Sequence, residues 1–174
     1  MKNFDYDDLP ALGRMAGWIA ERLSPGDVLT LEGSLGVGKT ELVRRIVGRL
    51  GHDASTVSSP TFSLVNFYDG DPRIVHIDLY RIESTVDLEG LDLEELLPIP
   101  DGIVMIEWPD IADHLVPRKR VSIRMRLTEE GNRRAEVEGL DESPVTGAQR
   151  KASGDGEDLA PSRSDENKQE SSRS

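Results

Sequence analysis

Residues 33–40 have the types and the spacing of a phosphate-binding loop, Gly-Ser-Leu-Gly-Val-Gly-Lys-Thr. Its three glycines let the backbone turn tightly with the NH groups pointing inward, where they can bind an anion. The lysine can reach the outer phosphates of a nucleotide, and the threonine hydroxyl can ligate Mg²⁺. The pattern therefore predicts binding of a nucleoside triphosphate with magnesium. The residues expected to hold the nucleotide here are Gly33, Leu35, Gly36, Val37, Gly38, Lys39, Thr40 and Glu41.

Two acidic residues are candidates for the second half of such a site. Asp78 follows the β-rich run Ile-Val-His-Ile at 74–77, and Glu107 follows the apolar run 103–106. A carboxylate at the carboxyl end of a buried strand is costly without a cation or hydrogen-bond donors. We therefore expect both acids, together with Lys39, to act in hydrolysis and to share one Mg²⁺ site with Thr40. The alternative that either acid only caps a turn stays open.

The elements that must position these residues follow from local patterns. The apolar and β-branched run 28–32 predicts a buried parallel strand, and residues 40–50 have helical spacing until Gly51 stops the helix. An earlier helix over 9–23, capped by Asp7 or Asp8, precedes the strand. The other expected elements are a hairpin of runs 62–68 and 73–77, two short helical turns in 84–97 divided near Gly90, a strand over 103–106, and an antiparallel pair over 121–127 and 135–137.

The length and composition predict one domain and a tail. The chain has 174 residues with 36% hydrophobic content, and after residue 141 the apolar pattern gives way to Ser, Gly, Asp, Glu, Lys and Arg. We expect one P-loop ATPase domain over residues 1–140 and a disordered acidic and polar tail over 141–174. Zero cysteines exclude disulfides and a cysteine nucleophile. No apolar stretch approaches eighteen residues and the first residues are polar and acidic, so we expect a cytoplasmic protein with no membrane partner.

The net charge of -12 argues against strong direct binding of nucleic acid. The basic clusters are short, and each is more typical of a solvated face than of a binding patch. Any RNA partner is therefore expected to be held by another protein. The segment Asn-Lys-Gln-Glu at 167–170 partly matches the motif with which guanine-nucleotide proteins recognise the base. That motif needs a rigid buried strand before it, and the sequence predicts none there. Adenine is therefore the expected base.

Four motifs in order give a more specific signal than the phosphate loop alone. The loop is followed by Ser-Pro-Thr-Phe at 59–62, His-Ile-Asp-Leu-Tyr-Arg at 76–81 and Glu-Trp-Pro at 107–109. From about residue 8 to residue 137, this set resembles the bacterial TsaE family, the ATPase component that helps make threonylcarbamoyladenosine in transfer RNA. The resemblance implies a three-layer P-loop NTPase-like α/β fold with a mixed central sheet. It also implies ATP and Mg²⁺ as cofactors, and TsaD and TsaB as protein partners.

The resemblance also assigns roles to individual residues. Thr40 and Glu107 match the metal-binding positions, and Asp78 matches the acid of the His-x-Asp-x-Tyr-Arg motif. Ser59 and Thr61 lie in a loop that resembles a nucleotide-sensing switch. Glu41 departs from the Thr or Ser of many members, which leaves the phosphate contacts intact but alters the first helical turn.

Two further residues have two interpretations each. Arg133 in the last hairpin could cover the nucleotide, and an exposed cross-strand charge explains it equally well. His76 alternates with apolar residues, which favours a hydrogen-bonded structural group over a proton carrier.

The sequence leaves three functions open. The first is an ATPase that drives a tRNA-modification machine, which the four ordered motifs favour. The second is a nucleotide-dependent assembly switch without significant turnover, in which the carboxylates only hold magnesium. The third is a small-molecule kinase, which would need an acceptor pocket and an arginine-rich lid. No such lid is recognisable in the sequence.

Overall fold

A computed structural model describes residues 1–60, 63–141 and 143–144 of the chain. The predicted switch residue Thr61 lies outside the described residues, and so does nearly all of the segment 141–174 that was predicted to be a disordered tail. Both expectations therefore stay predictions. Across the described residues, none of the helices combines the length and the apolar character needed to cross a membrane.

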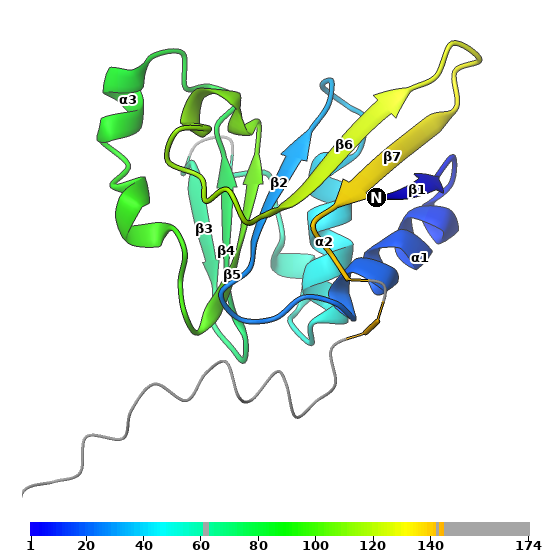
Figure 1. The fold of residues 1–174 in the computed structure, drawn as a ribbon, viewed down its shortest axis with the longest axis horizontal. Coiled ribbons are helices and arrows are strands. Elements are labelled where there is room, and N and C mark those ends of the chain that lie inside the picture. The colour runs from blue at the N-terminus through cyan, green and yellow to red at the C-terminus, as the bar shows by residue number, and fades with distance from the viewer. Residues whose placement is uncertain (61–62, 142, 145–174) are drawn as a thin grey trace, which may run out of the picture.

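A seven-stranded mixed sheet forms the centre of the molecule, in the order β1-β7-β6-β2-β5-β4-β3 (Figure 1). The strands are β1 (Lys2–Asp5), β2 (Val28–Glu32), β3 (Val65–Tyr68), β4 (Arg73–Asp78), β5 (Gly102–Glu107), β6 (Val121–Leu127) and β7 (Arg133–Glu138). Strands β6, β2, β5 and β4 are parallel, whereas β3, β7 and β1 each run antiparallel to the strand beside them. The mixed sheet predicted for this chain is confirmed.

Helices cover both faces of this sheet. The longer ones, α1 (Leu9–Ala20) and α2 (Lys39–Arg49), lie against one face and share a core cluster with the sheet residues Leu29, Leu31 and Met105. The other face, over β2, β5 and β4, packs against α3 (Thr85–Glu89) and the 3₁₀ turns η2 (Leu93–Leu96) and η3 (Pro109–Ala112). A further 3₁₀ turn, η1 (Ala54–Thr56), follows α2. The expected three-layer α/β fold is confirmed.

Local chemistry explains where the two long helices begin. The Asp8 side chain caps α1, accepting a hydrogen bond from the backbone NH of Ala11 at 2.6 Å. Helix α2 begins directly after the loop, with Gly38 as its N-cap at φ 114°. Gly33 at φ 143° lies so close to Met125 that an added Cβ would collide with its carbonyl oxygen. Glycine is therefore required there both by conformation and by space.

Several elements differ from the sequence predictions. Strand β3 begins at Val65, inside the predicted run 62–68, and the 3₁₀ turns η1 and η3 were not predicted. Helix α1 ends at Ala20 rather than at residue 23, where the ladder tightens and the backbone NH of Arg22 donates to the Ile19 carbonyl three residues back, at 2.9 Å. Strand β1 was not predicted at all. Its four residues are mostly exposed and form an edge strand only through pairing with β7. A short polar segment of this kind has no apolar run that would reveal it.

Candidate nucleotide-binding site

The phosphate loop and both predicted acids lie at one edge of the sheet. The loop connects the end of β2 to the start of α2, while Asp78 and Glu107 are the last residues of β4 and β5. The three strands are parallel neighbours, so their carboxyl ends meet. Asp78 lies opposite Glu107 in the strand register, and Glu107 lies opposite Leu31. This edge is where ligands bind in open α/β sheets.

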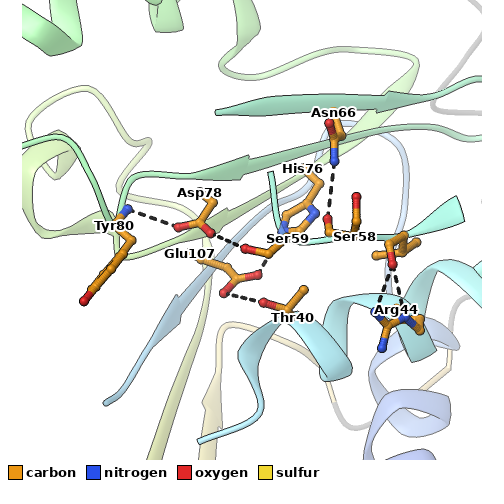
Figure 2. A network of polar contacts seen from close by, with 10 residues as sticks. Thr40, Arg44, Ser58, Ser59, Asn66, His76, Asp78, Tyr80 and Glu107 are labelled. Carbon is orange, nitrogen blue, oxygen red and sulfur yellow. Dashed lines mark hydrogen bonds and ion pairs between the residues drawn. The ribbon is translucent and has the colours of Figure 1, made fainter. Parts of the chain in front are cut away.

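Hydroxyl groups contact both acids (Figure 2). The Thr40 hydroxyl donates to Glu107 Oε2 at 3.1 Å, and the Ser59 hydroxyl donates to Asp78 Oδ2 at 2.7 Å. The backbone NH of Tyr80 also donates to Asp78 Oδ1 at 3.1 Å. Both residues are buried, with Asp78 6% exposed and Glu107 2% exposed. The structure thus brings Thr40, Asp78 and Glu107 to one place, and it adds Ser59, which the sequence analysis placed only in a switch-like loop.

Lys39 is buried beside these carboxylates. Its Nζ donates to the carbonyl oxygens of Gly33 at 2.7 Å and Ser34 at 3.1 Å, and lies 3.7 Å from the centroid of the Trp108 ring. Burial lowers the pKa of the Lys39 ammonium, while the nearby Glu107 and Asp78 carboxylates act in the opposite direction. A cation therefore lies within the field of the two acids, at the base of the phosphate loop.

Trp108 contributes an aromatic ring to this site. It has left-handed backbone angles, φ 58° and ψ 57°, directly after Glu107. This conformation accompanies the ring's position against Lys39 and beside the Tyr80 ring, 5.0 Å away between centroids. A cation over an aromatic face is electrostatically favourable. The motif Glu-Trp-Pro pointed to Trp108, but its contact with Lys39 had no sequence signal.

Arg133 begins β7, which lies on the other side of β2 from the acid-bearing strands β5 and β4. It lines a pocket of about 470 Å³ together with Gly36, Gly38 and Glu41. Its backbone NH donates to the Asp7 carboxylate at 2.6 Å. The remaining residues that line this pocket are Tyr6, Asp7, Asp8, Leu9, Leu12 and Val37. The pocket places Arg133 beside the loop, where a base or ribose could lie.

Two residues of this region behave in ways that the sequence did not indicate. Glu41 faces the pocket, but its carboxylate pairs with Arg44 and Arg45 on the next turn of α2, the second at 2.9 Å. Tyr6 is buried, and its hydroxyl donates to the carbonyl oxygen of Val37 at 3.3 Å. Burial raises the pKa of the Tyr6 phenol to about 12. Tyr6 precedes α1 in a polar segment, so nothing in the sequence marked it as a support for the loop.

The donor atoms at the acid pair suit a hard cation. Thr40, Asp78 and Glu107 offer a hydroxyl and two carboxylates, the oxygen ligands that Mg²⁺ prefers. In the described part of the chain, however, no group of three or more His, Cys, Asp or Glu side chains is arranged to hold a metal by itself. This fits Mg²⁺, which is ordinarily held by one or two carboxylates together with substrate phosphates.

Comparisons with known proteins show which proteins this chain is similar to. A family model described as "Threonylcarbamoyl adenosine biosynthesis protein TsaE" matches residues 7–135. The tRNA threonylcarbamoyladenosine biosynthesis protein TsaE of Rickettsia bellii is 35% identical over 115 residues, covering 66% of this chain and 78% of the relative. The protein of the same name from Bacillus subtilis is 39% identical over 100 residues, covering 57% and 61%. The crystal structure of Bacillus subtilis YdiB is 26% identical, with a TM-score of 0.60 over 77% of this chain and 82% of that one.

Proposed function

The chain belongs to the TsaE family of tRNA threonylcarbamoyladenosine biosynthesis, and from this premise we propose that it is the ATP-hydrolysing component of that machinery. One observation carries the proposal. Glu107 and Asp78 lie opposite each other at the strand ends, and the phosphate-loop residue Thr40 is hydrogen-bonded to Glu107. The loop can hold the phosphates, and the hydroxyl and the two buried carboxylates can hold Mg²⁺ and position a water, which are the parts that phosphoryl transfer to water uses.

Each residue has a role in this proposal. Backbone NH groups of residues 33–40 and the Lys39 ammonium bind the phosphates, because both place positive charge at the start of α2. Thr40 and Glu107 hold Mg²⁺, with Asp78 beside them. When bound, the metal neutralises charge on the phosphate oxygens. Asp78, which accepts a hydrogen bond from Ser59, orients the water that attacks the terminal phosphorus. The bond to the leaving ADP oxygen breaks, and inorganic phosphate is released.

We further propose that the protein acts with TsaB and TsaD in the cytoplasm. The sequence shows no recognisable arginine finger, so turnover alone is expected to be slow, and contact with a partner would complete the site. The net charge of -12 supports a role in which tRNA is held by the partners rather than by this chain.

The test is ATP hydrolysis measured for the protein alone and with TsaB and TsaD. We expect slow turnover alone, faster turnover in the complex, and loss of both in Lys39→Ala and Thr40→Ala with unchanged circular dichroism. Lys119→Ala is the matched control, because Lys119 is exposed and precedes β6 at the opposite edge of the sheet. Nucleotide binding without turnover under every condition would favour the assembly switch. Phosphate transferred to an added acceptor would favour a kinase.

A further inference from the structure

A buried histidine lies directly beneath the two acids. On the sheet face that α2 covers, β4 presents Ile74, His76 and Asp78 in succession, and the register places Met105 opposite His76 and Glu107 opposite Asp78. Ile74 and Met105 belong to the core cluster of that face, and His76 is fully buried. The imidazole therefore separates the apolar core from the acid pair.

The imidazole and the phosphate loop hold the two oxygens of one carboxylate. His76 Nε2 lies 2.9 Å from Glu107 Oε1, and the Thr40 hydroxyl donates to Glu107 Oε2 (Figure 2). The two contacts come from different elements, β4 and α2, on opposite sides of the carboxylate. Two such anchors fix the rotation of the carboxylate about its own axis as well as its position.

The surroundings of the other ring nitrogen indicate which atom carries the proton. Among the described residues, His76 Nδ1 has no hydrogen-bond partner. Asn66 lies opposite His76 on β3, but its amide donates to the Ser58 carbonyl oxygen at 3.3 Å and accepts from the Ser63 hydroxyl at 2.9 Å. An orphaned buried N–H is rarer than an orphaned acceptor, and the Glu107 oxygen can only accept. His76 is thus assigned as the tautomer that donates from Nε2 to Glu107.

We propose that His76 is a positioning residue for the magnesium site. By holding Oε1 of Glu107, its Nε2–H keeps Oε2 on the side of Thr40, where the metal would be held. The inference rests on the proposed function, because it assigns a purpose to a contact with a proposed metal ligand. Groups that support ligands in this way typically change metal affinity or activity by about 10-fold to 100-fold when they are removed.

Three substitutions separate positioning from packing. Gln places an amide nitrogen near the position of Nε2, Asn places it near Nδ1, and Leu fills the space with no donor. His76→Gln should therefore keep the bond to Glu107, whereas His76→Asn and His76→Leu should lose it. The readout is the affinity for ADP by calorimetry, measured once with MgCl₂ and once with EDTA, so it does not depend on turnover.

For the wild type we expect tighter ADP binding with MgCl₂ than with EDTA. His76→Leu and His76→Asn should lose about 10-fold or more of the affinity in MgCl₂ while keeping the affinity in EDTA, and His76→Gln should stay close to the wild type. In hydrolysis assays the same two variants should lose kcat by 10-fold to 100-fold, with a smaller change in KM.

Several results would overturn the role of His76. Wild-type magnesium dependence in His76→Leu, or an equal loss in the Gln and Asn variants, would show that the donor is not needed. An equal loss in EDTA, or unfolding of all three variants, would show that His76 only packs. A wild-type protein whose ADP affinity does not respond to MgCl₂ would instead contradict the proposed function itself.

Discussion

Replacing Glu107 with Gln should separate the activity of the site from the stability of the fold. Glu107 is 2% exposed and lies opposite Asp78 on the adjacent strand. Neighbouring strands are about 4.8 Å apart, and two like charges at about 5 Å repel by about 3 kcal/mol at an effective dielectric constant of about 20. The Lys39 ammonium offsets part of this repulsion. Removing the charge of Glu107 therefore relieves the repulsion between the two carboxylates and stabilises the folded state.

The same substitution weakens the hydrogen bonds of residue 107, which lowers the stability of the folded state. Bonds to a charged acceptor contribute about 1.5–3 kcal/mol, and neutral ones about 0.5–1.5 kcal/mol. A Gln oxygen can still accept from His76, and its NH₂ group can donate to the Thr40 hydroxyl, so both contacts remain possible in weaker form. The loss is about 2 kcal/mol, which is close to the repulsion relieved. We expect Glu107→Gln to unfold at nearly the wild-type urea concentration.

Hydrolysis should respond quite differently, because the metal loses an anionic ligand. We expect a loss of about 100-fold in kcat, equivalent to about 2.7 kcal/mol of transition-state stabilisation. The assay is phosphate release at saturating ATP and MgCl₂, with or without TsaB and TsaD, beside urea unfolding followed by circular dichroism. Glu136→Gln is the control, since Glu136 pairs with Arg126 on the β6-β7 hairpin. Wild-type turnover in Glu107→Gln, or a stability loss above about 3 kcal/mol, would refute this reasoning.

Three further predictions concern Gly33, Tyr6 and the residues after Leu140. Gly33→Ala should lower the free energy of unfolding by at least about 2 kcal/mol, because the added Cβ would collide with the Met125 carbonyl oxygen. Gly51→Ala, at positive φ with open space around it, is the control and should lower the same free energy by about 1 kcal/mol. Equal losses of stability for the two variants in urea unfolding would contradict the clash. Burial raises the pKa of the Tyr6 phenol from 10.0 to about 12 in the folded state. The protonated phenol therefore contributes its full share of the folding stability below pH 10, and this share is lost as the pH rises to 12. The wild type should then lose up to about 2.7 kcal/mol more than Tyr6→Phe over that window, and parallel pH profiles would argue against it. A protein truncated after Leu140 should retain ATP binding by calorimetry, since β7 ends at Glu138; aggregation or lost binding would show that residues 141–174 are needed.

The strands that carry the site could be predicted because each is a run of mostly apolar and β-branched residues. Residues 28–32 form β2 as expected, and the runs before Asp78 and Glu107 are the bodies of β4 and β5. Parallel strands buried on both faces give this pattern directly. Both acids could therefore be placed at strand ends, and the ordered motifs indicated the family that the comparisons confirm.

The partners of individual side chains could not be predicted from the same runs. Strand order and register decide that β5 lies between β2 and β4, and neither is encoded in the periodicity of a single strand. The contact between His76 and Glu107, and that between Lys39 and Trp108, depend on this arrangement. Strand β1 was not predicted for a related reason, because its pairing with β7 and not its own residue pattern makes it a strand.

The chemistry of the site depends on the register of β4 more than on any one contact. His76 and Asp78 are two residues apart, so both side chains point toward α2, while Val75 and Ile77 point toward α3. A shift of one residue would exchange these sets and place two aliphatic side chains beside Glu107. Pairing with β5 on one side and β3 on the other opposes that shift, and Asp78 is held further by its backbone NH bond to Leu64 at 2.9 Å. The β3-β4 hairpin, although it carries no proposed ligand on β3, therefore keeps the histidine and the acid in the site.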